Sequence, residues 1–216
     1  MVTSGPEGRH PGWPARLGPV RIASGEIALR PIRLRDAFEW SRLRLRDEAY
    51  LRKWEPEASG SWAQRSTPMA WPAQCAGSRA IARRGQALPF AITLDGRLAG
   101  QVTVGNVVRG ALLSAWVGYW VESGVAGCGV ATAAVALAVD HAFSRVGLHR
   151  VEATVRPENM ASLRVLTKLG FRDEGLLLRY LEVDGAWRDH RLLAMTREEI
   201  GTGLVTRLID QGRVRR

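Results

Sequence analysis

The sequence predicts an α/β (α+β) domain with a central twisted sheet, mixed but mostly antiparallel, of about seven strands flanked by about four helices. Three observations support this prediction. Two short turns, Asp95-Gly96 and Asp184-Gly185, each separate a pair of strand-like segments. Between these hairpins, the glycine-rich turn ESGVAGCGVATAA (122–134) leads from a strand-like run into an apolar, helix-like run. The overall order, β-α-α-β-β-β-α-β-α-β-β, is typical of a mixed sheet with helices packed against it.

The chain has 216 residues, and the domain is expected to occupy residues 25–200. Residues 1–24 are rich in Gly, Pro and Arg without periodicity, so we expect a flexible leader there. This segment has no apolar core of a secretory signal, and no apolar run in the chain is long enough for a membrane span. Residues 201–216 are expected to form a basic tail with room for a turn of helix.

The first elements of the domain are a strand and a helix. Residues 26–33 alternate like a strand. Asp36 is expected to cap the following helix with Glu39 as its capping-box partner, and Leu43 is expected to lie on the inner side of that helix. Residues 50–72 contain three tryptophans and three prolines, and are expected to form a long loop or short helical pieces.

The middle of the chain carries the first hairpin. A helix is expected at about 73–84, before strands at 90–94 and 98–108 that are joined by the first Asp-Gly turn. A third strand at 114–121 runs directly into the glycine turn. The helix that follows the turn is expected to continue to about Arg145.

The last part of the domain repeats this alternation. A strand is expected at 149–155, followed by a helix over MASLRVLTKL (160–169) that Gly170 closes as a left-handed cap. The second Asp-Gly turn then joins two strands within 171–196.

Composition limits the classes of function. The formal net charge is +10, and nearly all the cations are arginines, so the surface favours phosphate-rich partners and allows a weak contact with RNA or the ribosome. The aromatic motifs of RNA-binding domains are absent. The two cysteines, Cys75 and Cys128, form no CxxC pair and no His-rich cluster accompanies them. This argues against a disulfide framework and a metal site, and favours a reducing cytoplasm.

The glycine turn has three usual meanings, and two of them fit poorly. Gly124 and Gly129 have the spacing of a nucleotide phosphate loop, but Val130 and Ala131 stand where that loop needs Lys and Ser or Thr. A dinucleotide fingerprint fails at its third glycine. The third meaning is a cradle of backbone N–H groups that holds a pyrophosphate at a helix N-terminus. From the turn alone, a tight strand-to-helix connection without a ligand is an equal alternative.

The wider context resembles the GNAT superfamily of acetyl-CoA-dependent N-acetyltransferases. The superfamily loop, Q/R-x-x-G-x-G/A, corresponds to residues 126–131, with Ala126 in place of the usual Gln or Arg. RPENMASLRVLTKLGFRDEG (156–175) is similar to a block of the ribosomal-protein-alanine acetyltransferase group, the RimJ/RimL type. YLRKWEP (50–56), GYWV (118–121) and YLEVDGAWRDH (180–190) resemble the RimJ branch in particular.

The resemblance implies a reaction and a set of partners. Acetyl-CoA is the cosubstrate, no metal is needed, and the acceptor is a protein N-terminus, by resemblance an alanine of a ribosomal protein. Two other hypotheses stay open: acetylation of a small amine or a lysine side chain, and a ribosome-assembly or RNA-associated factor with secondary acetyltransferase activity.

The resemblance also implies which residues bind the cosubstrate. The implied cofactor-binding residues are Tyr119, Trp120, Val121, Ala126, Gly127, Cys128, Gly129, Val130, Ala131, Thr132, Asn159 and Ser162. In this set the backbone of residues 119–121 pairs with the pantetheine, and Asn159 binds the same arm. Asn159 is also a good N-cap for the helix that follows it. Ser162 is a candidate catalytic residue that donates to the leaving sulfur, or it satisfies a free N–H of the same helix.

The proton acceptor has no single clear candidate. Glu182 ranks first, ahead of Glu122 and Glu55, and Tyr180 is an alternative donor to the sulfur. Trp54 and Glu55 are expected to bind the acceptor. The tryptophan-rich loop around them is either a lid or a satellite core. The histidines His141, His149 and His190 are interpreted as structural.

Overall fold

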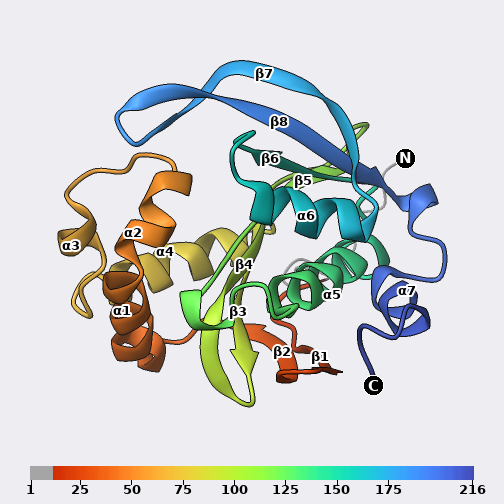
Figure 1. The fold of residues 1–216 in the computed structure, drawn as a ribbon, viewed down its shortest axis with the longest axis horizontal. Helices are drawn as coiled ribbons and strands as arrows, with labels where there is room; N and C mark the ends of the chain where they lie inside the picture. Colours follow the sequence, from red (N-terminus) through yellow and green to blue (C-terminus); the bar gives the residue numbers. More distant parts are fainter. Residues whose placement is uncertain (1–11) are drawn as a thin grey trace.

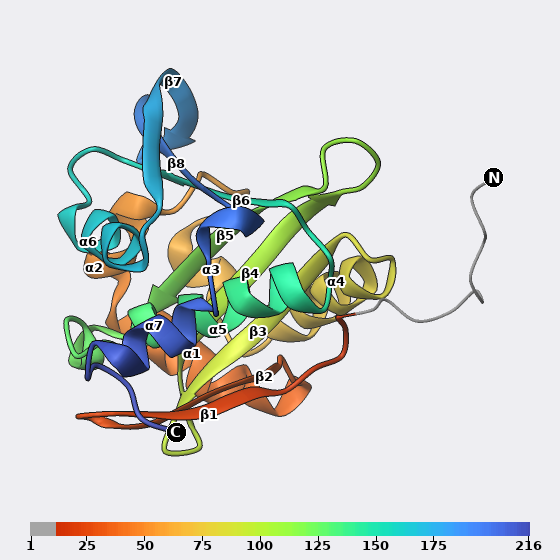
Figure 2. The same cartoon turned by 90° about the vertical axis from the view of Figure 1, so that its right-hand side faces the viewer.

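The computed structural model describes residues 12–216, and these form one mixed sheet (Figures 1 and 2). Its strands are β1 (Leu17–Ile22), β2 (Gly25–Pro31), β3 (Ala87–Leu94), β4 (Arg97–Val108), β5 (Ser114–Val121), β6 (Arg150–Val155), β7 (Arg172–Val183) and β8 (Ala186–Thr196). Within this part of the chain the sheet has eight strands in the order β1-β2-β3-β4-β5-β6-β8-β7. Only β5 and β6 pair in parallel, so the expected mixed, mostly antiparallel sheet is confirmed with β1 as an extra strand.

Helices cover both faces of the sheet. They are α1 (Ala37–Arg46), α2 (Glu48–Leu51), α3 (Trp62–Arg65), α4 (Trp71–Arg83), α5 (Val130–Ser144), α6 (Met160–Leu169) and α7 (Leu204–Asp210), with short 3-10 helices η1 (Leu34–Asp36), η2 (Arg52–Trp54), η3 (Ser123–Val125) and η4 (Arg197–Glu199). Figures 1 and 2 show α5, α6 and α7 on one face and α1 to α4 on the other. The β7–β8 hairpin arches away from the body of the sheet.

Two hydrophobic cores lie on the opposite faces. The larger one surrounds α5, whose residues from Ala133 to Val139 are all buried, because this helix is apolar on every side. The smaller one joins α1 and α4 to the sheet through residues that include Trp40, Leu43 and Trp71. Leu43 therefore lies on the inner side of its helix as expected.

The two ends of the chain belong to the domain more than the sequence suggested. The expected leader, 1–24, is wrong from residue 13 onward: Trp13 is buried against Phe90 at 5.3 Å between ring centroids, and β1 pairs with β2. The rest of that leader, residues 1–11, lies outside the described residues. At the other end, Leu204 and Leu208 of α7 are buried against the larger core. Both ends are held by apolar contacts with residues that are distant in sequence. The local composition of the ends therefore does not reveal these contacts.

Two local predictions have different outcomes. The capping box of Asp36 and Glu39 is wrong, because the Asp36 carboxylate accepts two hydrogen bonds from Arg30 (2.8 and 2.9 Å) and one from the Arg33 N–H (2.8 Å). Glu39 instead pairs with Arg42 on the same helix. The segment 50–72 does consist of short helical pieces, as expected.

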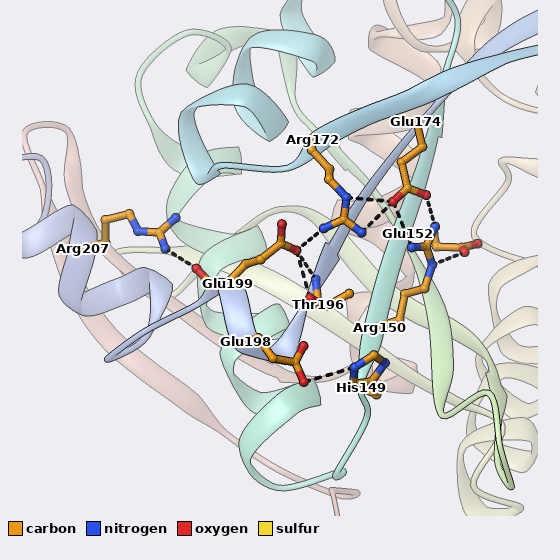
Figure 3. Close-up of polar contacts among 9 residues, drawn as sticks. All are labelled: His149, Arg150, Glu152, Arg172, Glu174, Thr196, Glu198, Glu199 and Arg207. Carbon is orange, nitrogen blue, oxygen red and sulfur yellow. Dashed lines mark hydrogen bonds and ion pairs between the residues drawn. The ribbon is translucent and has the colours of Figure 1, made fainter.

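An ion-pair network joins β6, β7 and η4 (Figure 3). Arg150 donates to Glu152 at 2.6 Å and to Glu174 at 3.0 Å, and Arg172 bonds Glu174 and Glu199. These hydrogen bonds, above all that from Arg150, lower the pKa of Glu174 to about 2. The network connects β6, β7 and η4 at the end of the sheet where β5 and β6 are still paired. Among the described residues, no helix is both long and apolar enough to cross a membrane.

Candidate active site

The parallel pair β5 and β6 separates after three residue pairs. The strands are in register from Ser114↔Arg150 to Trp116↔Glu152 and no further, although β5 continues to Val121 and β6 to Val155. The outer edge of each strand stays paired, β5 with β4 and β6 with β8. The inner edges beyond the split therefore present main-chain N–H and C=O groups with no strand partner in the described chain.

A cleft of about 1240 Å³ occupies this split. One side, which we call the loop wall, includes Gly127, Gly129, Thr132, Asn159 and Ser162. The opposite side, which we call the tryptophan wall, includes Trp54, Glu55, Trp120, Tyr180 and His190.

The glycine turn forms the loop wall next to the N-terminus of α5. Gly127 and Gly129 have φ values of 80° and 90°, in the left-handed region that favours glycine. The first main-chain bond of α5 is from the Ala133 N–H to the Gly129 carbonyl, so the N–H groups of residues 130–132 have no helical acceptor. A left-handed turn, unpaired N–H groups and a helix N-terminus fit a pyrophosphate held by main chain alone.

The side chains of the turn are either small or lie outside the cleft. Ala126, Ala131 and Thr132 line the cleft, whereas the Val130 side chain is fully buried in the core and offers only its N–H. The Cys128 thiol is exposed and free, and it is not part of the cleft lining. The small side chains leave the main chain accessible from the cleft.

A buried carboxylate anchors the start of this turn. Asp47, at the end of α1, accepts hydrogen bonds from the Ser123 N–H at 2.8 Å and the Ser123 hydroxyl at 2.7 Å. Arg46 bonds both Asp47 and Glu122 at 2.8 Å. Burial raises the pKa of Asp47, but the hydrogen bonds from Arg46 and Ser123 outweigh it and lower that pKa to about 2. The position of the loop thus depends on a residue from the opposite face of the sheet, and no local pattern in the sequence predicts this contact.

Two hydroxyl groups meet across the split. The Tyr119 hydroxyl lies 2.9 Å from the Ser162 Oγ, and burial raises the pKa of Tyr119. The Asn159 side chain accepts a hydrogen bond from the Ser162 N–H at 3.1 Å, which confirms its role as the N-cap of α6. Sequence reasoning assigned Tyr119 a role only through its backbone, and missed that its side chain pairs with Ser162.

The tryptophan wall rests on a buried ion pair. Arg44 donates two hydrogen bonds of 2.7 Å to Glu55, and only 8% of the Arg44 side chain is exposed. The guanidinium carbon lies 4.3 Å from the ring centre of Trp62 and 5.7 Å from that of Trp120. Trp62 is buried here, so this part of the tryptophan-rich segment is a satellite core.

Arg44 was missed by sequence reasoning, although a signal for it exists. It follows Trp40 by four positions and Leu43 by one, so helical periodicity puts it on the buried face of α1. Trp54 is half-buried at the edge of the cleft, between the Lys53 ammonium at 5.1 Å and the Arg156 guanidinium at 5.4 Å from its ring centre.

The predicted catalytic residues are not all brought together. Ser162 and Tyr180 line the cleft, but Glu182 is exposed and is not among the lining residues. Glu122 is bonded to Arg46 and is likewise absent from the lining. A strand period of two would place Glu182 on the same face as Tyr180. The adjacent residues Tyr180 and Leu181 both line the cleft and Glu182 does not, so the irregular part of β7 does not follow this alternation.

Main chain also joins the tryptophan wall to the β7–β8 hairpin. Pro56 forms an isolated antiparallel bridge with Val183, and the Glu57 N–H donates to the Glu182 carbonyl at 2.8 Å. The Gly185 N–H donates to the Glu57 carboxylate at 3.2 Å. Two segments more than a hundred residues apart therefore meet beside the cleft, as the view of the hairpin tip in Figure 1 suggests.

The three histidines lie in different surroundings. The His141 Nε2 bonds the Gly12 carbonyl at 2.8 Å inside the larger core, and burial lowers the pKa of this side chain. His149 is exposed and pairs with Glu198 at 3.2 Å. His190 is buried and, unlike the other two, lines the cleft.

Comparison with known proteins agrees with this geometry. Residues 26–172 match the family described as acetyltransferase (GNAT) domain. A solved structure of Mycobacterium smegmatis RimJ in complex with CoA-disulfide is 55% identical, with a TM-score of 0.94, over 96% of this chain and 99% of that one.

Curated relatives point to the same group. The chain is 28% identical to the [ribosomal protein uS5]-alanine N-acetyltransferase of Escherichia coli (strain K12) over 187 residues, which are 86% of this chain and 95% of that protein. It is 45% identical to the probable N-acetyltransferase YjcK of Bacillus subtilis (strain 168) over 101 residues, a match that spans 47% of this chain and about half, 56%, of that relative. The loop, the split strands and these matches together place the chain in the GNAT acetyltransferase family, whose members transfer an acetyl group from acetyl-CoA to an amine.

Proposed function

We propose that this enzyme acetylates the α-amine of the N-terminal alanine of ribosomal protein uS5. The observation that carries the proposal is the similarity to RimJ over nearly the whole length of both chains, at 55% identity. The Escherichia coli relative that is named for this acceptor is also matched over 95% of its length. The two matches span 96% and 86% of this chain.

Different residues of the cleft would bind the cosubstrate, donate a proton and bind the acceptor. Bound acetyl-CoA supplies an acetyl thioester with an electrophilic carbonyl carbon. The N–H groups of the loop wall would bind the pyrophosphate, and the free edge of residues 119–121 would pair with the pantetheine amides. The Tyr119 and Ser162 hydroxyls, 2.9 Å apart, would donate a proton toward the departing sulfur. Trp54 and Glu55 would bind the acceptor peptide.

The chemistry of the acceptor favours a chain terminus over a lysine. An α-amine has a pKa of about 7.7–8.0 and a lysine side chain about 10.4, so near neutral pH the neutral amine costs less than about 1.5 kcal/mol in the first case and more than about 4 kcal/mol in the second. The cleft has no unpaired carboxylate among its described lining residues, which suits the acceptor that is easier to deprotonate.

The test is acetyl transfer to a peptide that copies the N-terminus of uS5, followed by mass spectrometry. We expect acetylation of the α-amine and none of a matched peptide whose α-amine is blocked but whose lysines are free. A peptide that begins with serine and a set of small amines complete the panel. Faster acetylation of the blocked peptide or of a small amine would show that another acceptor is the natural one.

A further inference from the structure

The carboxylates that line the cleft are all paired with arginines. Glu55 accepts two hydrogen bonds from Arg44, and Glu152 accepts one from Arg150 at 2.6 Å. Glu158 lies 3.3 Å from the Arg156 guanidinium. A carboxylate that already balances a guanidinium is a weak proton acceptor, because protonation would leave the arginine charge unpaired. Another group must therefore be considered for the proton of the incoming amine.

His190 has the geometry of a proton acceptor. Its side chain is buried on β8, with 3% of the residue exposed, and it lines the cleft. The ring Nδ1 lies 3.0 Å from the Arg188 carbonyl oxygen. A carbonyl only accepts, so Nδ1 carries the hydrogen and the neutral ring has its lone pair on Nε2. No hydrogen bond among the described residues uses this Nε2.

An irregularity in β7 brings a tyrosine onto the same ring. The register passes from Leu177↔His190 to Leu181↔Arg188, so β7 has extra residues opposite Asp189. Arg179 in this bulge has a φ of 48°, and its N–H donates to the Asp189 carboxylate at 2.7 Å. Bulges redirect side chains next to active sites. Here the bulge places the next side chain, Tyr180, edge-on to the His190 ring with 5.9 Å between ring centroids.

We propose that His190 is the general base of the reaction. This inference rests on the acetyl transfer proposed above, and it applies to any amine acceptor. The other titratable groups that line the cleft are the carboxylates Glu55, Glu152 and Glu158, the cations Lys53, Arg156, Arg164 and Lys168, and the tyrosines Tyr50, Tyr119 and Tyr180.

The proposed step moves two protons away from the acceptor ammonium. Nε2 of His190 takes one proton from the acceptor ammonium, and the freed nitrogen lone pair forms the C–N bond to the acetyl carbonyl carbon. The C–S bond breaks with its electron pair on sulfur. A second proton of the nitrogen reaches that sulfur through the Tyr119 and Ser162 hydroxyls, and the third remains in the amide product. His190 then releases its proton to solvent, which completes the cycle.

The variant His190→Asn separates catalysis from structure. An asparagine amide N–H at this position can replace the Nδ1–H bond to the Arg188 carbonyl, but it offers no basic nitrogen in place of Nε2. We expect kcat/KM for the best α-amine peptide to fall about 100-fold at pH 7, with acetyl-CoA affinity by calorimetry unchanged. The gap to the wild type should narrow above about pH 8, where the acceptor is already neutral. His149→Asn, at an exposed histidine outside the cleft, is the control and should leave the rate unchanged.

A measurement on the wild-type enzyme tests the assignment of His190 even if the variant does not fold. In ¹⁵N-histidine spectra, His190 should be the Nδ1–H tautomer, and its Nε2 signal should move when CoA and an acceptor peptide bind together. An Nε2–H tautomer, or wild-type rates in a folded His190→Asn with intact acetyl-CoA binding, would overturn the assignment. If the wild type acetylates no α-amine peptide, the acceptor proposal fails instead, and the same variant is then assayed with whichever amine it does acetylate.

Discussion

The two walls of the cleft are built in different ways. The loop wall comes from the glycine turn and the first turn of α6, and it presents mainly backbone groups and small side chains. The tryptophan wall combines segments from residue 44 to residue 190, and its character depends on which charged side chains pair with one another. A backbone site follows from local sequence, whereas a side-chain site depends on contacts that form only in the folded chain. If the two walls act separately, a substitution in one wall should change only the ligand contacts of that wall.

The largest effect is expected from Gly129→Asp in the loop wall. Aspartate at a φ of 90° is strained, and its carboxylate would repel the pyrophosphate. We expect the acetyl-CoA Kd, measured by calorimetry, to rise about 100-fold, which corresponds to about 2.7 kcal/mol. Gly96→Asp is the matched control, because Gly96 also has a left-handed φ of 79° but lies in the β3–β4 turn outside the cleft. Equal affinities in the two variants would remove the loop from the site.

The next effect tests the link between the two faces of the sheet. Asp47→Asn removes the charge that holds Ser123, so the free energy of unfolding at pH 7 should fall by about 2 kcal/mol, and acetyl-CoA binding should weaken with it. The pKa of Asp47 in the folded protein is about 2, below its ordinary value of 3.8. Its contribution is therefore complete above the ordinary value and is lost as the pH falls through 2.

Urea unfolding at several pH values measures this contribution. The wild-type and Asp47→Asn free energies of unfolding should converge between about pH 4 and pH 2. Glu39→Gln removes a partly exposed carboxylate from α1 and should change stability by less than about 0.5 kcal/mol. A gap for Asp47→Asn that does not change with pH would mean that the charge is not its source.

A smaller effect is expected in the tryptophan wall. Trp54→Ala removes a half-buried ring between two cations at the edge of the cleft. We expect KM for the acceptor peptide to rise about tenfold, with the acetyl-CoA Kd unchanged, because the contact is remote from the loop wall. Trp187→Ala removes a ring that is 62% exposed and outside the cleft lining, so both constants should stay at wild-type values. A change in acetyl-CoA affinity in Trp54→Ala would show that the walls are coupled.

The smallest effect is expected far from both walls. His149 and Glu198 form an exposed pair, with 50% and 68% of their side chains accessible. His149→Ala should change the free energy of unfolding by less than about 0.5 kcal/mol, and the acceptor KM should not change. Thermal unfolding and steady-state rates measure the two quantities. A larger loss of stability would extend the structural role of the network in Figure 3 to this pair.

The order of elements from residue 26 to residue 196 could be predicted from the sequence, because hairpin turns, a left-handed cap at Gly170 and alternating runs are local signals. The ends of the chain could not, since Trp13 and Leu204 are held by contacts with distant residues. The turn around Gly129 is another local signal. Its sequence predicts a backbone cradle for an anion, and its left-handed glycines agree with that prediction.

The proton acceptor was the least predictable feature. Glu182 ranked first from its place near the second hairpin turn, but the extra residues in β7 change which side chains of the hairpin reach the cleft. Glu55 lines the cleft, yet nothing local indicated that Arg44 would pair with its carboxylate. Both outcomes depend on strand register and on ion pairs between distant residues, which periodicity and motif spacing do not encode.

The bridge between Pro56 and Val183 has a consequence for how an acceptor enters. Main chain crosses one flank of the cleft there, and it is fastened by two further hydrogen bonds through Glu57. Because these bonds join the hairpin tip to the segment that follows Trp54 and Glu55, this flank can open only if the bonds break or both segments move together. An acceptor at this side of the cleft would therefore meet a fixed boundary rather than a free hairpin tip.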